Sequence, residues 1–282
     1  MWGEKVSQDE SHRAPIIGYH RAPLSQKFGA PRQPNLVALT SVIEMRAPYD
    51  TPAAFVGLEA FSHIWVSWQF HHNYLDKGNG LHKADREFRP QVRPPRLGGN
   101  QKIGVFASRS MYRPSALGLS VVKLERVAVV QGRALLIISG ADMINDTPII
   151  DIKPYVAYSD AIAQAESGFA PTAPVSSEVT ITESAYAQFI TLVHTGESGR
   201  GDNKPTDTEP ATVAALLYKI QNQLSLSDID AIKALIAQDP RPAYRRHELK
   251  MPFIMRYKSV DVSFQLLESG QLQISSVVAV SL

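Results

Sequence analysis

Short runs of apolar and β-branched residues, separated by turns rich in proline and glycine, fill the first half of the chain. Such runs predict β-strands because branched and aromatic side chains suit a pleated, half-buried surface. The predicted strands cover residues 14–19, 36–45, 60–70, 102–107, 120–130, 134–139 and 148–152. Residues 90–99 predict extended backbone, and no strong helical periodicity occurs before residue 160. This pattern favours an antiparallel barrel or sandwich.

The pattern changes in the second half. Residues 166–182 combine prolines, serines and threonines with little apolar periodicity, which predicts a linker. Apolar residues at helical spacing predict helices over 184–194, over 211–224 and from Ser227 to a stop at Asp239-Pro240. Alternating residues then predict a hairpin of strands 260–266 and 271–280. We therefore expect three parts: a β-domain at 1–165, a linker and flexible acidic segment with one helix at 166–210, and a small α+β domain at 211–282.

Composition narrows the class of protein. The chain has 282 residues and no cysteine, which excludes disulfides, thiolate metal sites and thiol nucleophiles. No apolar run is long enough to cross a bilayer. The first thirteen residues are polar and lack the apolar centre of a secretion signal, so we expect a cytoplasmic location.

Charge is unevenly spread although the net charge is only +2. Residues 83–113 include eight basic and two acidic residues, and residues 239–258 include six basic and two acidic residues. Residues 160–210 include eight acidic and two basic residues. Two basic islands around an acidic spacer indicate a localised surface for phosphate groups.

Signals for a glycine-rich nucleotide site are missing. The G-x-G at Gly78 and Gly80 has no third glycine and no following helix pattern, and no Walker-type loop occurs. A Rossmann cofactor site is therefore not expected. His71, His72 and His82 do not have the spacing of metal ligands, so no metal site is expected.

Several polar turns contain groups that can bind a ligand, and each also has a simpler explanation. Residues 31–33 can clasp a polar ligand or form a solvated proline loop, and His71 and His72 can contact a nucleoside or cap the sheet. Prolines beside Arg93, Arg96 and the arginines of 109–113 fix their direction, which favours an anion or base partner over mere surface charge. Residues 241–246 place a tyrosine between arginines, as in base-stacking sites, or form a solvated helix end.

Eight motifs occur together, in the order of one known family. They are PRQPNL (31–36), GLEAFSHIWV (57–66), FHHN (70–73), VRPPRLGGN (92–100), GVFASRS (104–110), RPSALGLSVVKLERV (113–127), DTPIIDIKPY (146–155) and AQDPRPAYR (237–245). Over residues 14–160 and again over 237–282, the chain resembles the TrmO (YaeB/VirR-like) family of tRNA adenine-N6-methyltransferases. Each motif alone is weak, whereas their joint occurrence is specific.

The resemblance implies a mainly β fold, with an N-terminal antiparallel β-barrel and a small C-terminal α+β domain. It implies an S-adenosyl-L-methionine-dependent enzyme, without a Rossmann sheet, that works as a homodimer with the cofactor near the subunit interface. The implied reaction methylates N6 of N6-threonylcarbamoyladenosine, just 3′ of the anticodon, in tRNA for threonine.

Site residues follow from the motifs. The residues expected to surround the cofactor are Pro31, Arg32, Gln33, His71, His72, Arg109, Leu119, Asn145, Asp146, Thr147 and Pro148. Those expected to approach the tRNA anticodon loop are Arg93, Arg96, Arg113, Arg241, Tyr244 and Arg245. No residue is a compelling general base, and the candidates are His71, His72, Asp142 and Asp146.

Two motifs depart from the family pattern. Where the family usually has R-P-N-P-I-G, residues 113–118 have Ser115 and Ala116 in place of the asparagine and the second proline. Where it usually has D-G-T-P, residues 145–148 have Asp146 in place of the glycine. If that glycine adopts a positive φ, Asp146 tolerates it better than most residues. Two alternatives stay open: a non-catalytic regulator that binds RNA or the cofactor, and a methyltransferase acting on another substrate through the same barrel.

Overall fold

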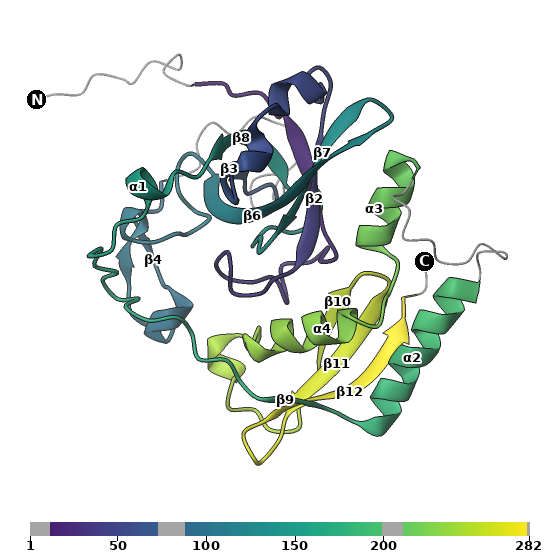
Figure 1. The fold of residues 1–282 in the computed structure, drawn as a ribbon. Helices are drawn as coiled ribbons and strands as arrows, with labels where there is room; N and C mark the ends of the chain where they lie inside the picture. Colours follow the sequence, from purple (N-terminus) through teal and green to yellow (C-terminus); the bar gives the residue numbers. More distant parts are fainter. Residues whose placement is uncertain (1–11, 73–87, 199–210, 281–282) are drawn as a thin grey trace, which may run out of the picture.

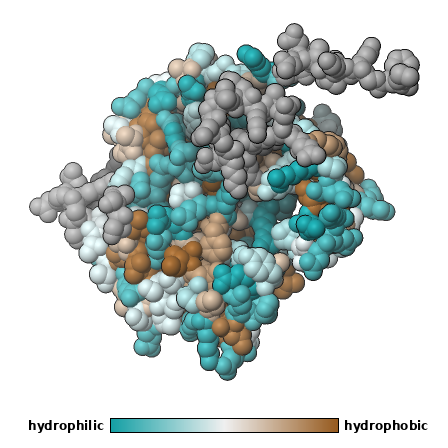
Figure 2. Space-filling view, turned by 180° about the vertical axis from the view of Figure 1, so that it is seen from behind, coloured by the Kyte–Doolittle hydropathy of each residue, from teal (hydrophilic) through white to brown (hydrophobic). Residues whose placement is uncertain are grey.

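A computed structural model describes residues 12–72, 88–198 and 211–280. Two β-sheets dominate it, one closed into a barrel and one open sheet covered by helices (Figure 1). Figure 2 shows the reverse face, where hydrophobic residues gather in separate patches among hydrophilic ones. None of the helices in these ranges is long and apolar enough to cross a membrane.

The N-terminal part is a closed six-stranded barrel in which every pairing is antiparallel, with the order β1-β2-β7-β6-β3-β8. Its strands are β1 (Gly18–Arg21), β2 (Thr40–Met45), β3 (His63–Gln69), β6 (Leu117–Val130), β7 (Arg133–Ser139) and β8 (Pro148–Pro154). This finding confirms the expected mainly β fold with an N-terminal antiparallel barrel. The alternation in β3 places Ile64, Val66 and Trp68 inside the barrel, because successive side chains of a strand point to opposite faces.

Short elements decorate the barrel. They are η1 (Pro52–Phe55), η2 (Leu58–Ala60), β4 (Gln91–Val92), η3 (Pro95–Leu97), β5 (Ile103–Gly104), η4 (Val105–Ala107) and α1 (Ala157–Asp160). The prediction of a strand over 102–107 is therefore only partly correct. After Gly104 the chain turns, and both the N–H and the hydroxyl of Ser108 donate to the carbonyl oxygen of Val105.

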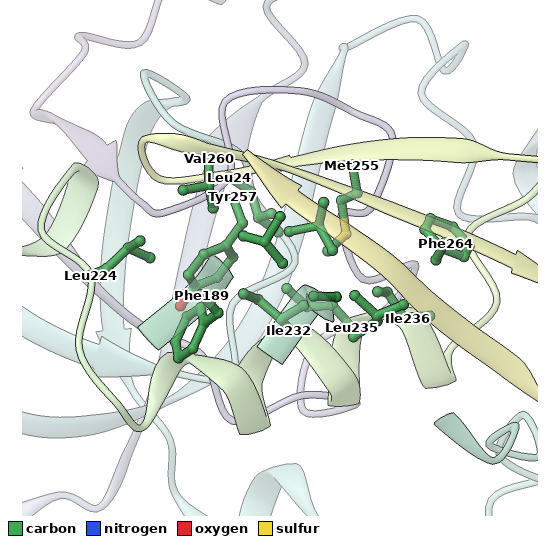
Figure 3. Packing of buried hydrophobic residues seen from close by; sticks show 14 of the residues in the cluster. Leu24, Phe189, Leu224, Ile232, Leu235, Ile236, Met255, Tyr257, Val260 and Phe264 are labelled. Carbon is green, nitrogen blue, oxygen red and sulfur yellow. The ribbon is translucent and has the colours of Figure 1, made fainter. Parts of the chain in front are cut away.

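The C-terminal part is a four-stranded sheet with the order β10-β11-β12-β9. Its elements are β9 (Val179–Ile181), α2 (Glu183–Ser198), α3 (Val213–Gln221), α4 (Asp228–Ala237), η5 (Ala243–Arg245), β10 (Phe253–Tyr257), β11 (Val260–Leu266) and β12 (Leu272–Ala279). The sequence pattern did not predict β9 or β10. Residues 179–198, assigned to the linker segment, contribute β9, which pairs in parallel with β12, and α2, whose Phe189 lies in the core of this sheet (Figure 3). The boundaries at 165 and 211 stay a prediction.

A loop of the barrel domain forms part of the C-terminal core. Leu24, Val37 and Leu39 are buried together with side chains of α2, α4 and the open sheet, and Figure 3 places Leu24 beside Tyr257. Phe28, from the same loop, stacks 6.3 Å from Phe253 between ring centroids. The two parts of the chain therefore share one apolar core.

Helix α3 makes a second connection, on the outside of the barrel. Its Val213 and Leu216 are buried against Val42 of β2 and Leu135 of β7. Gln221, at its end, donates to the side-chain oxygen of Asn145 at 2.6 Å. The C-terminal part thus contacts the barrel through both an inserted loop and a docked helix.

A buried ionic cluster holds α4 against the β10–β11 hairpin. Asp228 accepts hydrogen bonds from the Tyr257 hydroxyl at 2.6 Å and from Lys258 at 2.8 Å. Burial and the neighbouring carboxylate raise the pKa of Tyr257, so its hydroxyl keeps the proton that it donates. Removing one partner of such a buried group is costly because the other charge is left uncompensated.

His20 joins β1 to the turn before β8. One of its ring nitrogens, Nδ1, donates to the carbonyl oxygen of Ile144 at 3.1 Å, and Nε2 accepts from the Ser41 hydroxyl at 2.8 Å. The side chain is buried, which lowers the pKa of His20 to about 4. The neutral imidazole is therefore the form that fits this position.

We expect His20 to make the protein acid-sensitive. Because its folded-state pKa lies below the unfolded value of about 6.5, the unfolded chain takes up the proton first, and the free energy of unfolding should fall by about 3 kcal/mol between pH 6.5 and pH 4. The variant His20→Gln should lose this slope while being less stable at pH 7. Urea unfolding at several pH values measures both quantities, and identical slopes in the two proteins would contradict the assignment.

Candidate functional site

Loops that are far apart in the sequence meet at one end of the barrel. Arg109 donates through Nη1 to the side-chain oxygen of Gln33 at 2.5 Å, which joins the loop after β5 to the proline loop at 31–35. Asn35 fixes that loop to the barrel, since its backbone N–H donates to the Gly140 carbonyl at 2.8 Å and its side chain donates to Val121 at 3.0 Å. Gly140 adopts a φ of +80°, and a Cβ there would lie 2.5 Å from the Asn35 side chain. The close approach therefore requires glycine.

The turn at 145–148 is bound to β1 and the loop that follows it, since the backbone N–H of Asp146 donates to the His20 carbonyl at 2.8 Å and that of Asn145 to the Leu24 carbonyl at 2.7 Å. Asp146 adopts a φ of +63°, which bears out the expectation that it occupies a left-handed glycine position. Its carboxylate accepts hydrogen bonds from Arg21 and from the Asn145 side chain. Thr147 is buried and donates to the Ile144 carbonyl at 2.8 Å, and Pro148 begins β8. The turn is therefore rigid and carries an ion-paired carboxylate.

A chain of hydrogen bonds runs from the barrel interior to Asp142. The indole N–H of Trp68 donates to the Ser120 hydroxyl oxygen at 3.0 Å, and that hydroxyl donates to Asp142 Oδ1 at 2.5 Å. Burial raises the pKa of Asp142, and the nearby Arg109 opposes that shift. Asp142 is thus a partly buried carboxylate that faces the Arg109–Gln33 junction.

His71 and His72 follow the end of β3. Their ring centroids lie 4.1 Å apart, and Nε2 of His71 is buried without a hydrogen-bond partner. Burial, followed by the charge of His72, lowers the pKa of His71, while Asp146 raises it. His71 is therefore close to the 145–148 turn, and its imidazole is neutral at pH 7 with one nitrogen left to bind something else.

The structure separates Leu119 from these groups. Leu119 is exposed on the outer face of β6, opposite the inward Ser120. It lines an open cavity of about 500 Å³ on the outside of the barrel, together with Trp65, Ser67 and Tyr158.

Arginines of the first basic island are held in different ways. Arg113 donates to the Ser108 carbonyl at 2.5 Å and thereby closes its own turn. Arg96 donates to the Thr172 carbonyl at 2.5 Å, and Arg93 is exposed. These arginines therefore also organise loops of the protein.

The second basic island, at 239–248, contains one exposed aromatic side chain and several arginines in ion pairs. Tyr244 is 75% exposed. Arg241 is buried and holds both oxygens of Asp239, at 2.8 and 3.1 Å. Arg245 pairs with Glu248 at 2.8 Å and lies over the Phe253 ring. Tyr244 is therefore the residue of this motif that is free to contact a base, while Arg241 supports the loop from below.

Sequence reasoning missed four residues of this region: Arg21, Trp68, Ser120 and Asp239. The strands predicted over 60–70 and 120–130 include Trp68 and Ser120, but no sequence pattern indicated the hydrogen bonds that link them to Asp142. Arg21 carried no sequence signal because its partners, Glu44 and Asp146, are distant in the sequence. Asp239 carried none because its contact with Arg241 depends on a backbone conformation with a positive φ of 44°.

Some sequence predictions fall outside the described residues. Asn73 of the FHHN motif, His82 and the basic residues Lys83 and Arg86 are among them. Within the part of the chain that the structure covers, no group of three or more histidine, aspartate or glutamate side chains is arranged to hold a metal ion.

Comparisons with known proteins find relatives of this chain. The family profile described as "tRNA-methyltransferase O N-terminal domain" matches residues 19–161, and the one described as "TrmO C-terminal domain" matches residues 210–280. A relative from Escherichia coli (strain K12), named tRNA (adenine(37)-N6)-methyltransferase, is 36% identical over 82% of this chain and 83% of its own length. A relative from Pseudomonas aeruginosa is 38% identical over 89% and 91%, and its name refers to S-adenosylmethionine-dependent methyl transfer.

A solved structure has a similar fold. The crystal structure of TrmO from Pseudomonas aeruginosa superposes with a TM-score of 0.66 at 28% identity, over 95% of this chain and 99% of that one.

We expect Gly118 to be essential for the interior of this site. A Cβ at Gly118 would lie 2.2 Å from the Trp68 indole ring, so Gly118→Ala must displace the ring that donates to Ser120. The expected loss is about 1–3 kcal/mol of unfolding free energy, the usual cost of overpacking, or more. Gly104→Ala is the matched control, because no atom lies within 4 Å of its added Cβ. Equal stability of the two variants in thermal unfolding would refute this account.

Proposed function

This chain belongs to the tRNA-methyltransferase O family, whose cofactor is S-adenosylmethionine, and from that membership and the geometry at the barrel end we propose that it methylates adenine 37 of tRNA at N6. The finer proposal is that the adenine carries an N6-threonylcarbamoyl group, in tRNA for threonine. The observation that carries the proposal is the convergence of loop 31–33, His71, Arg109 and turn 145–148 at one end of the barrel.

The side chains at this end fit the cofactor. His71 Nε2 is a buried polar atom without a partner, and Gln33 and Arg109 form a polar pair on an exposed loop. We propose that the residues that hold the cofactor are Pro31, Arg32, Gln33, His71, His72, Arg109 and Asn145 to Pro148. Leu119, which the sequence motifs also suggested, lies apart from them on the outer face of the barrel. S-adenosylmethionine supplies an activated methyl group on a sulfonium, so the protein mainly has to align the nucleophile and exclude water.

The protein must also make N6 nucleophilic. A carbamoylated N6 has a delocalised lone pair, and losing its proton restores reactivity. Asp142 is suited to accept that proton, because burial raises its pKa and because the hydrogen bond from Ser120 orients it. Asp142 would take the N6–H proton, and S-adenosylmethionine held by loop 31–33, His71 and Arg109 would supply the methyl group that N6 accepts.

The other candidate bases are less suited to the role. Asp146 is ion-paired with Arg21, so its carboxylate is already compensated. His71 is neutral at pH 7 and half-buried, which suits a hydrogen bond to the bound nucleoside. His72 is exposed. We therefore assign Asp146, His71 and His72 to positioning and Asp142 to proton transfer.

RNA binding follows from exposure and charge. The target adenosine has to leave the anticodon stack, and the exposed Tyr244 can stack on a base. We propose that Arg93, Arg96, Arg113, Arg241 and Arg245 contact the tRNA or hold the loops that do. We also propose a homodimer, in which the cavity beside Leu119 and the exposed Tyr158 on the outside of the barrel faces the second subunit.

The substrate is tested with two forms of threonine tRNA, with and without the threonylcarbamoyl group. Purified protein and labelled S-adenosylmethionine should transfer methyl to the modified form alone, and mass spectrometry of the digested nucleosides should find N6-methylated threonylcarbamoyladenosine. Equal transfer to both tRNAs, or transfer into a metabolite fraction, would indicate another substrate. Cofactor binding in calorimetry without any transfer would indicate a regulator that does not catalyse.

Proton transfer is tested with Asp142→Asn. We expect kcat to fall about 10²- to 10⁴-fold, the usual contribution of a general base. The acid limb of the wild-type pH–rate profile should lie above the range of an ordinary aspartate, because burial raises this pKa, and the limb should be absent in the variant. The control Asp151→Asn changes an exposed carboxylate on the outer face of β8 and should retain wild-type rates. An unchanged acid limb in Asp142→Asn would exclude Asp142 as the base.

A further inference from the structure

Two guanidinium groups share one carboxylate at the junction of the barrel and the C-terminal part, and a third guanidinium group lies beside them. Arg241 binds both oxygens of Asp239, and Arg246 approaches the same carboxylate at 3.4 Å. Arg32 reaches the same place from the barrel side and donates to the Arg241 carbonyl at 3.3 Å. The neighbouring Arg245 is compensated by its own partner, Glu248.

This cluster has more positive charge than its partners compensate. Arg241 is only 2% exposed, and its Nη1 is buried without a hydrogen-bond partner. Arg246 Nε also makes no hydrogen bond and has only the ion-pair contact with Asp239 at 3.4 Å. Burial and the charge of Arg246 lower the pKa of Arg32, which indicates repulsion between the two guanidinium groups that Asp239 only partly offsets. One carboxylate offsets one of three neighbouring guanidinium charges, and the excess positive charge at Arg32 and Arg246 is suited to a further anion.

The cluster is accessible and next to the proposed cofactor site. Arg32 is exposed, and the Arg246 side chain is 39% exposed, whereas Asp239 and Arg241 lie below them. Gln33, adjacent to Arg32, accepts the hydrogen bond of Arg109 at 2.5 Å. Arg32 is therefore the direct chain neighbour of a residue of the proposed cofactor site.

We propose that Arg32, Arg241 and Arg246 bind an oxyanion of the RNA substrate, a proposal that rests on the proposed function. Guanidinium groups are suited to this chemistry, because they donate paired hydrogen bonds to a carboxylate or a phosphate. Two sources provide such a group: the threonyl carboxylate, a few bonds from N6, and a phosphodiester next to the flipped nucleotide. Asp239 has a positioning role, in which it holds Arg241 beneath the site.

Three anticodon stem-loop RNAs separate these sources: one with the threonylcarbamoyl group, one with its carboxylate converted to a neutral methyl amide, and one unmodified. Wild-type protein should bind the carboxylate form at least tenfold more tightly than the amide. Arg246→Met should abolish that difference and leave the other two affinities unchanged, and Arg246→Lys should keep part of it. Arg256→Met is the matched control, because Arg256 is similarly paired with Asp261 outside the cluster.

The outcomes are distinct. If Arg246→Met lowers the affinity for all three RNAs by the same factor, the bound oxyanion is a phosphate. If Arg246→Met binds each of the three RNAs with the same affinity as Arg256→Met, the proposal is wrong. If Arg246→Met folds poorly, Arg32→Gln provides the same test from the barrel side of the cluster, and its affinity for the cofactor is measured in parallel. These affinities do not require turnover, so absence of methyl transfer by the wild type would refute the proposed function while the binding comparison still decides on the oxyanion site.

Discussion

The insertion of the 22–39 loop into the C-terminal core is the constraint on which the rest of the structure depends. Leu24, Val37 and Leu39 bury apolar surface that the barrel cannot cover, and each such side chain contributes about 1.5–3 kcal/mol. Their fixed position determines where the intervening residues lie. Arg32 and Gln33 therefore meet the C-terminal Arg241 and the barrel's Arg109 at the same junction. Two domains that fold around separate sheets are thereby held at one site.

Electrostatics at the barrel end depend on how each charged group is buried. Asp146 is neutralised by Arg21, whereas Asp142 is held by a neutral hydroxyl and keeps the character of a base. His20 lies beneath the same turn as a neutral imidazole. A closed barrel thus gives two nearby carboxylates different electrostatic environments, without the glycine-rich helix start of Rossmann folds.

The sequence predicted the barrel well, because short runs of apolar and β-branched residues, separated by proline and glycine turns, mark its strands. It missed β9, whose three residues are too few to show a period, and β10, where Arg256 and Pro252 obscure the alternation. The candidate site came mainly from the family motifs, since single polar residues carry little signal. The burial of Arg241 and the hydrogen bonds to Asp142 were not predictable, because they depend on contacts between segments distant in the sequence.

The turn at 113–118 shows how a local change in conformation limits the use of family patterns. Ala116 occupies the position at which the family pattern has proline, yet it adopts a φ of +53° and its N–H donates to the Arg113 carbonyl at 3.0 Å. Proline can do neither, because its ring holds φ near −65° and it has no N–H. Restoring the consensus residue, a common way to increase thermostability, would therefore damage this member. A transplant of the motif between relatives should move the whole turn together with the strand ends that it joins.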